Sequence, residues 1–215
     1  MAIRLFGQKF NNPVFVASGV YGYGLDFPLV VEQVGAVFSK GITKKPRAGN
    51  PPPRLIEVTA GAINSVGLEN VGIEAFVKKI LPKLKKTKIK IFVNIAGNSI
   101  DEYCYLAKAL GDEVTGIELN VSCPNVRNGL IFGQDPKMTS RLVNRVRKQT
   151  KLPIIVKLTP NFCNIVNVAK AAEESGADGV SLINTLHGMV YDICKRKPLI
   201  TGGLSGPAIK PFALY

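Results

Sequence analysis

The stretch Gly116-Ile117-Glu118-Leu119-Asn120-Val121-Ser122-Cys123-Pro124-Asn125 decides the interpretation of this chain. It begins as an apolar run typical of a buried strand and ends in a loop with two carboxamides, a hydroxyl and a thiol. Carboxamides offer hydrogen-bond donors and an acceptor without charge, which suits a planar ligand that carries amide groups. A thiol can take or give a proton once its pKa is tuned. An ordinary turn is the alternative, because Cys-Pro-Asn is turn-like.

The composition is that of an ordinary soluble globular chain. Its 215 residues are 46% hydrophobic and 20% charged, which is enough for a sizeable core in a single domain over residues 1–215. No apolar run approaches membrane-spanning length, and the N-terminus lacks the apolar centre of a signal peptide. The four cysteines form no CxxC pair and there is one histidine, so neither a disulfide framework nor a metal site is supported. We therefore expect a cytoplasmic protein with no metal and no membrane contact.

The net charge is strongly positive, with 28 Lys and Arg against 15 Asp and Glu. Much of the positive charge lies in three runs, at residues 83–90, 44–47 and 195–197. Such runs can bind nucleic acid or an acidic partner, but they are more often solvated helix ends and loops. No aromatic residues alternate with these lysines, as a platform for stacking single-stranded nucleic acid requires. We expect no nucleic-acid partner.

Short apolar segments alternate with amphipathic helices along the chain. The strand-like segments are apolar almost throughout, as parallel strands covered on both faces should be; they are Val14–Ala17, Ala36–Lys40, Ile91–Ile95, Gly116–Asn120, Ile154–Lys157 and Gly179–Asn184. Helices are predicted from an apolar stripe between Ile73 and Leu84, a capping box at Ser99 and Glu102, a start at Asp135-Pro136, and the segment from Asn164 to Gly176. Repeated strand–helix units predict a parallel sheet.

A doubly wound sheet and a (β/α)₈ barrel both fit this alternation, and the polar residues favour the barrel. One functional side chain stands at or near the carboxyl end of each predicted strand: Ser18, Lys40, Asn94, Asn120, Lys157 and Asn184. Bringing such side chains to a single mouth is the arrangement of a barrel active site. A dinucleotide-binding fold would place a GxGxxG motif after the first strand, and none is present there.

Motifs along the whole chain support a family resemblance. They are Asn12–Gly19, Ser39–Thr43, Pro46–Pro51, Asn64–Asn70, Asn120–Asn125, Val156–Pro160, Ile183–Leu186 and Gly202–Pro207. In this order and spacing they resemble the class 1 dihydroorotate dehydrogenases, the cytosolic FMN-containing type. The likeness is greatest to the NAD-linked class 1B catalytic subunit. Dihydropyrimidine dehydrogenases share this flavin barrel, but the loops around Asn64 and Cys123 look closer to the dihydroorotate enzymes.

The resemblance implies the oxidation of dihydroorotate to orotate with FMN as hydride acceptor, in the synthesis of pyrimidines and UMP. Cys123 is the implied base, and Lys157 is implied to lie beside the flavin and to stabilise the charge that develops on it. The implied substrate contacts are Lys40, Asn64, Ser65, Val66, Gly67, Leu68, Asn120, Asn184 and Thr185. The implied FMN contacts are Ser18, Lys40, Gly41, Asn94, Asn120, Lys157, Ile183 and Gly206. Residues 126–134 are expected to form a mobile flap over the substrate.

The resemblance also implies partners: a second copy of the chain, and an iron–sulfur subunit containing FAD that passes electrons to NAD. Fumarate as acceptor, the class 1A chemistry, stays an alternative. Six strand–helix units are fewer than the eight of a (β/α)₈ barrel. We therefore expect an incomplete barrel that lacks its last two units and leaves its first and last strands with open edges. A relative that binds orotate without turnover, or one with no ligand response at all, is then a further alternative. The remaining thiols, Cys104, Cys163 and Cys194, are expected to be packing or loop residues, and His187 an incidental loop residue.

Overall fold

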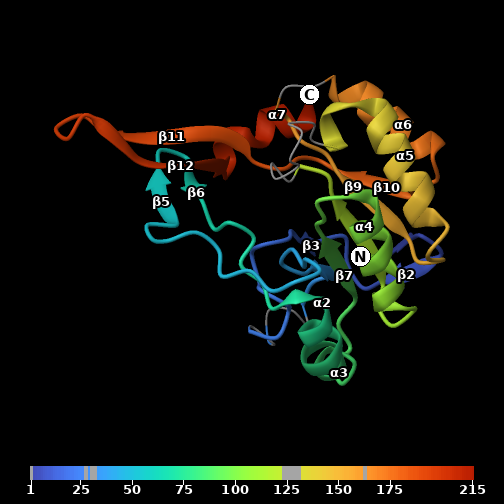
Figure 1. Cartoon of the computed structure of the whole chain (residues 1–215). Coiled ribbons are helices and arrows are strands. Elements are labelled where there is room, and N and C mark those ends of the chain that lie inside the picture. The colour runs from blue at the N-terminus through green and yellow to red at the C-terminus, as the bar shows by residue number, and fades with distance from the viewer. Residues whose placement is uncertain (1, 27–28, 30–32, 123–131, 162–163) are drawn as a thin grey trace.

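The computed structural model describes residues 2–26, 29, 33–122, 132–161 and 164–215. A curved sheet of six parallel strands forms its centre (Figure 1). In spatial order the strands are β3 (Phe15–Val16), β4 (Ala36–Phe38), β7 (Ile91–Ile95), β8 (Gly116–Asn120), β9 (Ile154–Lys157) and β10 (Gly179–Ser181). Spatial order follows chain order, so each strand lies beside the next, as in a barrel wall. The predicted fold is confirmed as a half-barrel.

The boundaries of three of the six strands were predicted correctly. Strands β7, β8 and β9 begin and end where the sequence places them. The other three are shorter than predicted, because the paired ladder ends before the apolar run does; β10, for example, stops at Ser181 rather than Asn184. Strands β3 and β10 have one partner each within this sheet, as expected for the two ends of an arc.

Helices cover the outer face of the sheet, and their ends carry the predicted caps. Helix α4 (Ile100–Leu110) starts where Ser99 Oγ accepts a hydrogen bond from the Glu102 backbone N–H. The Glu102 carboxylate accepts from the N–H of Asn98 rather than Ser99, so the capping box is shifted by one residue. Helices α5 (Pro136–Arg147) and α6 (Ile165–Glu174) begin at the side-chain caps Asp135 and Asn164.

The predicted helix between residues 73 and 84 has three parts. They are α2 (Gly72–Ala75), the π-helical segment η1 (Phe76–Ile80) and α3 (Leu81–Leu84). Two further short helical turns are η2 (Phe132–Gln134) and η3 (Pro207–Ile209), and α7 (Lys210–Leu214) is the last helix. Within the described ranges, every helix falls short of the length and hydrophobicity needed to cross a bilayer.

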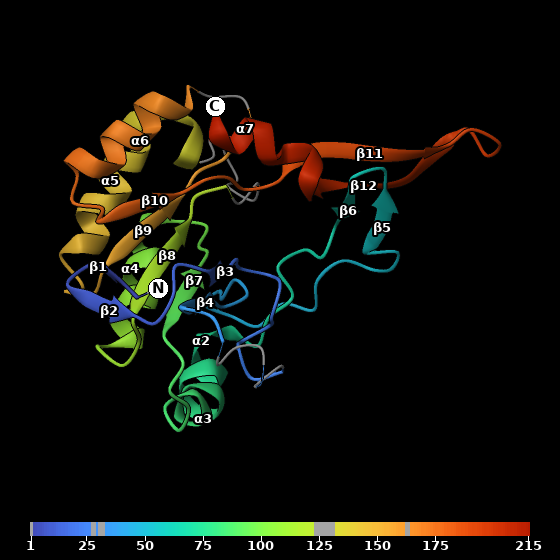
Figure 2. The same cartoon turned by 180° about the vertical axis from the view of Figure 1, so that it is seen from behind.

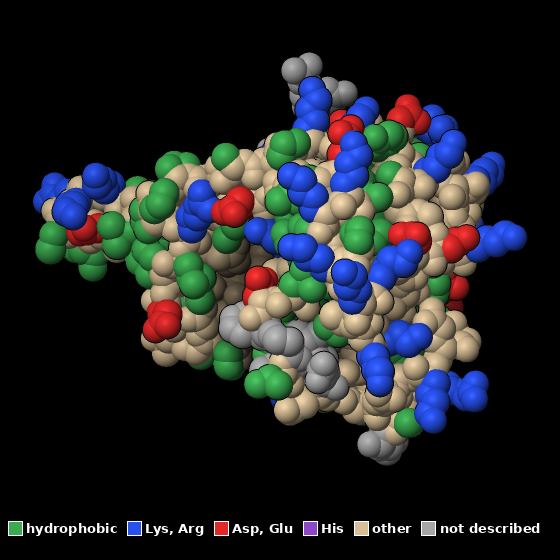
Figure 3. Space-filling view, turned by 90° about the horizontal axis from the view of Figure 1, so that it is seen from below, with side chains coloured by type: hydrophobic (Ala, Val, Ile, Leu, Met, Phe, Trp, Pro, Cys, Tyr) green, Lys and Arg blue, Asp and Glu red, His purple; other side chains and the backbone are tan. Residues whose placement is uncertain are grey.

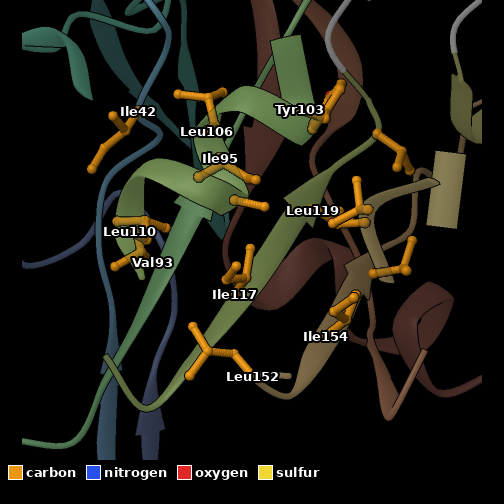
Figure 4. Packing of buried hydrophobic residues seen from close by; sticks show 14 of the residues in the cluster. Ile42, Val93, Ile95, Tyr103, Leu106, Leu110, Ile117, Leu119, Leu152 and Ile154 are labelled. Carbon is orange, nitrogen blue, oxygen red and sulfur yellow. The ribbon is translucent and has the colours of Figure 1, made fainter. Parts of the chain in front are cut away.

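The main core lies between the sheet and the helices. Figure 4 shows Leu106 and Leu110 of α4 beside Val93 and Ile95 of β7, all of them fully or almost fully buried. Because successive side chains of a strand point to opposite faces, alternate residues of β7 and β8 face this core. The residues between them, including Asn94 and Glu118, belong to the opposite, inner face of the arc.

A second, aromatic cluster fills the inner face near the amino ends of the strands. Phe38 and Phe92 stack with their ring centroids 4.9 Å apart, and Phe10 lies 6.2 Å from Phe92. Phe10 comes from a hairpin of β1 (Ile3–Leu5) and β2 (Gln8–Phe10), which the sequence did not predict. Burial of these rings closes one end of the arc, so the polar side chains at the carboxyl ends of the strands face the other end.

An antiparallel sheet extends from the half-barrel as an arm, and it too was missed. Its order is β11 (Leu186–Asp192), β12 (Lys197–Ser205), β6 (Gly61–Asn64) and β5 (Leu55–Val58). Figures 1 and 2 both show the β11–β12 hairpin reaching far from the central sheet. The prediction that His187 lies in a loop is wrong, because it is part of β11. The hairpin pairs with β6, more than 130 residues earlier, through Gly203 and Asn64.

The basic runs are largely solvated. Lys83, Lys85, Lys86 and Lys88 are exposed, as are Lys44, Lys45 and residues 195–197 at the tip of the arm. Figure 3 shows Lys and Arg side chains spread over the visible face of the body as well as at the tip of the arm. Their distribution fits ordinary surface charge better than a single basic interface.

Candidate active site

The predicted residues Asn120 and Lys157 stand side by side at the carboxyl end of the sheet. They are direct partners in the register of β8 and β9, and Lys157 is in turn the partner of Ser181 in β10. Both side chains belong to the inner face, because Leu119 and Val156 beside them are buried in the outer core. An amide and a cation therefore share one wall of the half-barrel.

Asn184 joins this wall from the segment after β10. Its side-chain Nδ2 donates a hydrogen bond of 3.2 Å to Asn120 Oδ1. Its backbone N–H donates to the carbonyl of Leu158, which anchors the segment beside the end of β9. On the other side, the Tyr103 hydroxyl donates to the Asn120 carbonyl at 2.6 Å. The side chains of Asn120 and Asn184 are thus in contact, and the backbone of each residue is anchored by a further hydrogen bond.

Lys157 and Lys40 differ in their surroundings. Among the described residues, the Lys157 ammonium makes no ion pair, although the residue is only half-exposed. The Lys40 ammonium lies 3.8 Å from a Glu69 carboxylate oxygen and 5.7 Å from the centre of the Tyr23 ring. A half-buried cation without a protein counter-charge favours an anionic or electron-rich ligand.

Tyr23 completes the surroundings of Lys40. Its hydroxyl accepts a hydrogen bond of 3.0 Å from the Val71 backbone N–H. Burial raises the pKa of the Tyr23 phenol, the Val71 hydrogen bond opposes that rise, and the Glu69 carboxylate adds to it. The phenol therefore stays neutral at physiological pH, and Glu69 is the counter-charge nearest to Lys40.

The predicted substrate loop, residues 64–68, is held by hydrogen bonds to neighbouring segments. Asn64 ends β6 and donates from Nδ2 to the Gly203 carbonyl of β12 at 3.1 Å. Asn50 Nδ2 donates to both the carbonyl and the hydroxyl of Ser65, at 3.0 Å each. Gly67 has a φ of +74°, and a Cβ there would lie 2.6 Å from Asn50 Oδ1, so glycine is required.

Leu68 brings this loop to the wall of the half-barrel. An added Cβ at Gly41 would meet Asn94 Oδ1 at 3.0 Å and Leu68 Cδ2 at 3.1 Å. Three predicted residues from three different segments therefore converge at one point, where the packing leaves little room for a side chain at position 41. Asn94 itself is fully buried in β7.

The remaining predicted positions are less closely connected. Thr185 lies against Gly203, where an added Cβ would collide with its Oγ1. Gly206 packs on Gly61 at the β5–β6 turn. A Cβ added to Gly206 would lie 2.7 Å from the Gly61 Cα. Ser18 follows β3, Ile183 follows β10, and Val66 accepts a backbone hydrogen bond from Asn50. No side-chain hydrogen bond joins these three to the Asn120–Lys157 wall within the described part of the chain.

The predicted base, Cys123, lies outside the described residues, as do Cys163 and residues 126–131 of the expected flap. Residues 132–134 of that flap form η2, in which Phe132 and Gly133 are buried. Ser122, the last described residue before Cys123, has a buried hydroxyl without a hydrogen-bond partner in the described ranges. Cys104 is buried within α4 and Cys194 is exposed between β11 and β12, as expected of packing and loop thiols.

The sequence analysis missed Glu118 and Asn161. Glu118 is buried in the middle of β8, where it accepts hydrogen bonds from Asn94 and Ser181. Asn161 donates to the Thr185 carbonyl at 2.9 Å and accepts from the His187 N–H, which supports the segment that carries Asn184. A carboxylate within an apolar strand is the signal that could have identified Glu118. No group of three or more metal-binding side chains occurs within the described part of the chain.

Comparison with known proteins shows the family of this chain. The family described as "Dihydroorotate dehydrogenase" matches residues 1–215. Three bacterial relatives carry the name "Dihydroorotate dehydrogenase B (NAD(+)), catalytic subunit". The protein of Geotalea uraniireducens is 48% identical, that of Alkaliphilus metalliredigens 50% and that of Caldicellulosiruptor bescii 51%. Each alignment covers 100% of this chain and 73% of the relative. The half-barrel, the converging carboxamides and a match over the full length together assign this chain to the dihydroorotate dehydrogenase family.

Proposed function

We propose that this chain acts in the oxidation of dihydroorotate to orotate, with FMN as the hydride acceptor, in pyrimidine biosynthesis. The observation that carries the proposal is the inner wall on which Asn120, Lys157 and Asn184 meet. A dihydropyrimidine ring has amide edges that carboxamides recognise, and the family membership supports this substrate.

The described residues fit a flavin. Asn94 Oδ1 is a buried acceptor without a partner among them, and it lies close to Gly41. Lys157 supplies a positive charge on the same inner face. FMN, when bound, supplies the acceptor for the hydride that leaves the substrate ring. A fixed cation stabilises the negative charge that accompanies that transfer without reorganising at the moment of reaction.

The chain's own residues have distinct roles. Cys123, three residues after the end of β8 in the sequence, takes the proton from the ring carbon beside a carbonyl. A base of this kind contributes roughly 10²–10⁴ in rate. Asn120 and Asn184 hold the amide edges of the ring, and Asn64 with the 65–68 loop closes the opposite side. Lys40 binds the substrate carboxylate, for which it exchanges part of its contact with Glu69.

The class of relatives implies an electron-transfer partner. The relatives are named as catalytic subunits of an NAD-linked enzyme, which supports a second subunit that passes electrons onward. We propose that this subunit carries an iron–sulfur cluster and FAD, that the catalytic chain forms a homodimer, and that the assembly works in the cytoplasm. A strong dependence of complex formation on ionic strength would support docking through the positive surface.

The experiment is reconstitution of the purified chain with FMN, followed by anaerobic addition of dihydroorotate. Bleaching of the flavin's visible absorbance supports the proposal. A flavin complex that is not bleached but binds orotate in a calorimetric titration indicates a binding protein without turnover. A chain that takes up neither FMN nor orotate contradicts the proposal.

Replacement of the proposed base refines the test. Cys123→Ser should slow bleaching strongly and leave FMN binding unchanged, because a hydroxyl is a poorer base than a thiolate at neutral pH. Cys194→Ser is the matched control, since Cys194 is exposed at the far end of the arm. Equal loss of FMN binding and bleaching in Cys123→Ser would mean that this thiol is structural.

A further inference from the structure

Glu118 is a buried carboxylate that the proposed chemistry does not use. It is 2% exposed, lies in the middle of β8 and faces the inner side of the arc. Both of its carboxylate oxygens accept hydrogen bonds: Oε2 from Asn94 Nδ2 at 2.5 Å, and Oε1 from Ser181 Oγ at 2.6 Å. No ion pair to Glu118 occurs among the described residues. A buried charge held only by hydrogen bonds is costly, which calls for a reason beyond packing.

The hydrogen bond to Glu118 fixes the orientation of the Asn94 amide. A carboxamide has one donor end and one acceptor end, whereas a carboxylate only accepts. Turning the amide over would place Asn94 Oδ1 against Glu118 Oε2, two acceptors facing each other at hydrogen-bond distance. The Asn94 donor end therefore points to Glu118, and its acceptor end points away from it.

That acceptor end is left unsatisfied within the described part of the chain. Asn94 Oδ1 is buried and has no hydrogen-bond partner in the described part of the chain. It lies over Gly41, next to Leu68, both of them in the proposed site. Burial of an unsatisfied carbonyl oxygen is unfavourable, so the oxygen is suited to a ligand that brings an N–H or O–H donor. A flavin offers both kinds of donor, in its ring imide and its ribityl hydroxyls.

We propose that Glu118 is a positioning residue that presents Asn94 Oδ1 as a fixed hydrogen-bond acceptor to the flavin. The proposal rests on the proposed function in so far as the ligand is FMN. It assigns to Glu118 an effect on flavin affinity that acts entirely through Asn94. Removing the constraint should weaken FMN binding roughly 5- to 100-fold, the range for one buried hydrogen bond left unmade.

A reciprocal exchange of the two side chains tests this role. In Glu118→Gln, one carboxamide must serve two donors, so Asn94 loses its fixed orientation and FMN affinity should fall. Asn94→Asp should also weaken binding, because it places two carboxylates face to face. In the double variant, the carboxamide introduced at position 118 donates to the carboxylate introduced at position 94 and accepts from Ser181. That carboxylate keeps an acceptor oxygen over Gly41. The double variant should therefore recover FMN affinity to within about threefold of the wild type.

The readouts are the FMN dissociation constant, measured by quenching of flavin fluorescence, and the thermal midpoint of each apoprotein. Glu174→Gln is the matched control, since it makes the same chemical change at an exposed position of α6. Recovery by the double variant supports the proposal. A double variant as weak as the singles, or a Glu118→Gln that binds FMN normally, overturns it. Where a single variant does not fold, the crystal structure of the wild-type FMN complex decides: Asn94 Oδ1 must lie within hydrogen-bond distance of a flavin donor, and any other arrangement overturns the proposal.

Failure of the proposed function gives a different result. Wild-type protein that binds FMN but is not bleached by dihydroorotate removes only the substrate assignment, and the double-variant cycle still decides the role of Glu118. Wild-type protein that binds no FMN overturns both proposals together.

Discussion

Asn120 Oδ1 accepts a hydrogen bond from Asn184 Nδ2 across 64 residues of sequence. This contact joins the end of β8 to the segment that follows β10, with β9 and Lys157 between them. Since Asn120 Oδ1 also accepts from the Ser122 N–H at 3.3 Å, one carboxamide links the wall to the residue before Cys123. The proposed base and the proposed substrate contacts are therefore coupled through Asn120.

Asn184→Ala should weaken the binding of orotate. The variant removes a donor to the substrate's amide edge and also frees Asn120 to turn, so we expect affinity to fall by roughly 10- to 100-fold, as for the loss of one to two hydrogen bonds. Calorimetric titration of the FMN-loaded chain measures it. Asn144→Ala, on the exposed face of α5, is the control and should bind as the wild type does. An unchanged orotate affinity in Asn184→Ala would remove Asn184 from the substrate site.

Lys157→Gln should slow the reduction of the flavin more than it weakens the binding of substrate. The loss of a fixed cation beside developing negative charge costs on the order of 10²–10³ in rate in comparable sites. Stopped-flow bleaching under saturating dihydroorotate isolates this step, and the flavin midpoint potential should fall as well. Lys151→Gln, an exposed lysine before β9, supplies the comparison. A potential that stays at the wild-type value would argue against a charge contact with the flavin.

Gly41→Ala should reduce FMN affinity. The added methyl would lie 3.0 Å from Asn94 Oδ1 and 3.1 Å from Leu68 Cδ2, both closer than ordinary van der Waals contact, so it displaces the acceptor oxygen or Leu68. Gly7→Ala provides a contrast, because nothing lies within 4 Å of its added Cβ although its φ is +70°. Gly7→Ala should therefore lower the thermal midpoint and leave FMN binding intact. The reverse pattern in the two variants would contradict the placement of the flavin beside Gly41.

Sequence patterns predicted the half-barrel because its strands carry strong local signals. Strands β7, β8 and β9 are buried on both faces, which gives each of them a nearly continuous apolar run in the sequence. The predicted ends of these three strands match the observed ends. The β1–β2 hairpin had no such signal, since its turn places Phe6, with a φ of +53°, where Gly or Asn is usual. The arm depends on pairing between β12 and β6, which no local pattern of either segment reveals.

The sequence predicted that candidate site residues share one end of the sheet, but it did not predict the contacts between them. Lys157 and Asn120 could be assigned to one mouth because each ends a parallel strand, and the register confirms that they are neighbours. The pairing of Asn94 with Glu118 depends on β7 and β8 lying in a register that places these two residues directly opposite each other. A shift of one residue in this register would turn Glu118 to the other face of the sheet, and the sequence alone does not specify the register.

Ser99→Ala should destabilise the fold by about 1 kcal/mol, or roughly 2–4 °C in Tm for a chain of this size. The variant deletes the hydroxyl that accepts the Glu102 N–H at the start of α4, and α4 packs on β7. Thermal unfolding of the apoprotein measures the change. Ser99→Asp keeps an acceptor at the cap and should stay close to the wild type. If both variants lose the same stability, the cap hydrogen bond is not the cause.

The two described thiols, Cys104 and Cys194, should react with iodoacetamide at different rates. Burial raises the pKa of the Cys104 thiol; Arg145 opposes that rise through its charge and a hydrogen bond, and the charge of Asp101 adds to it. Since the thiolate is the reactive form, alkylation of buried Cys104 should keep rising at pH values where that of a thiol with an ordinary pKa has levelled off, and it should be slower than that of exposed Cys194.

The same shift fixes the sign of a stability effect. A thiol whose pKa is higher in the folded state than in the unfolded state stabilises the fold below the unfolded value, and this contribution is lost as the pH rises through the folded value. Raising the pH should therefore destabilise the wild type more than Cys104→Ala, after correction for the lower stability of the variant at neutral pH.

The alkylation rates of Cys104 and Cys194 are measured by peptide mapping. The urea-unfolded chain is the control, in which the two rates should become equal. Equal rates in the folded chain would contradict the burial of Cys104 within α4.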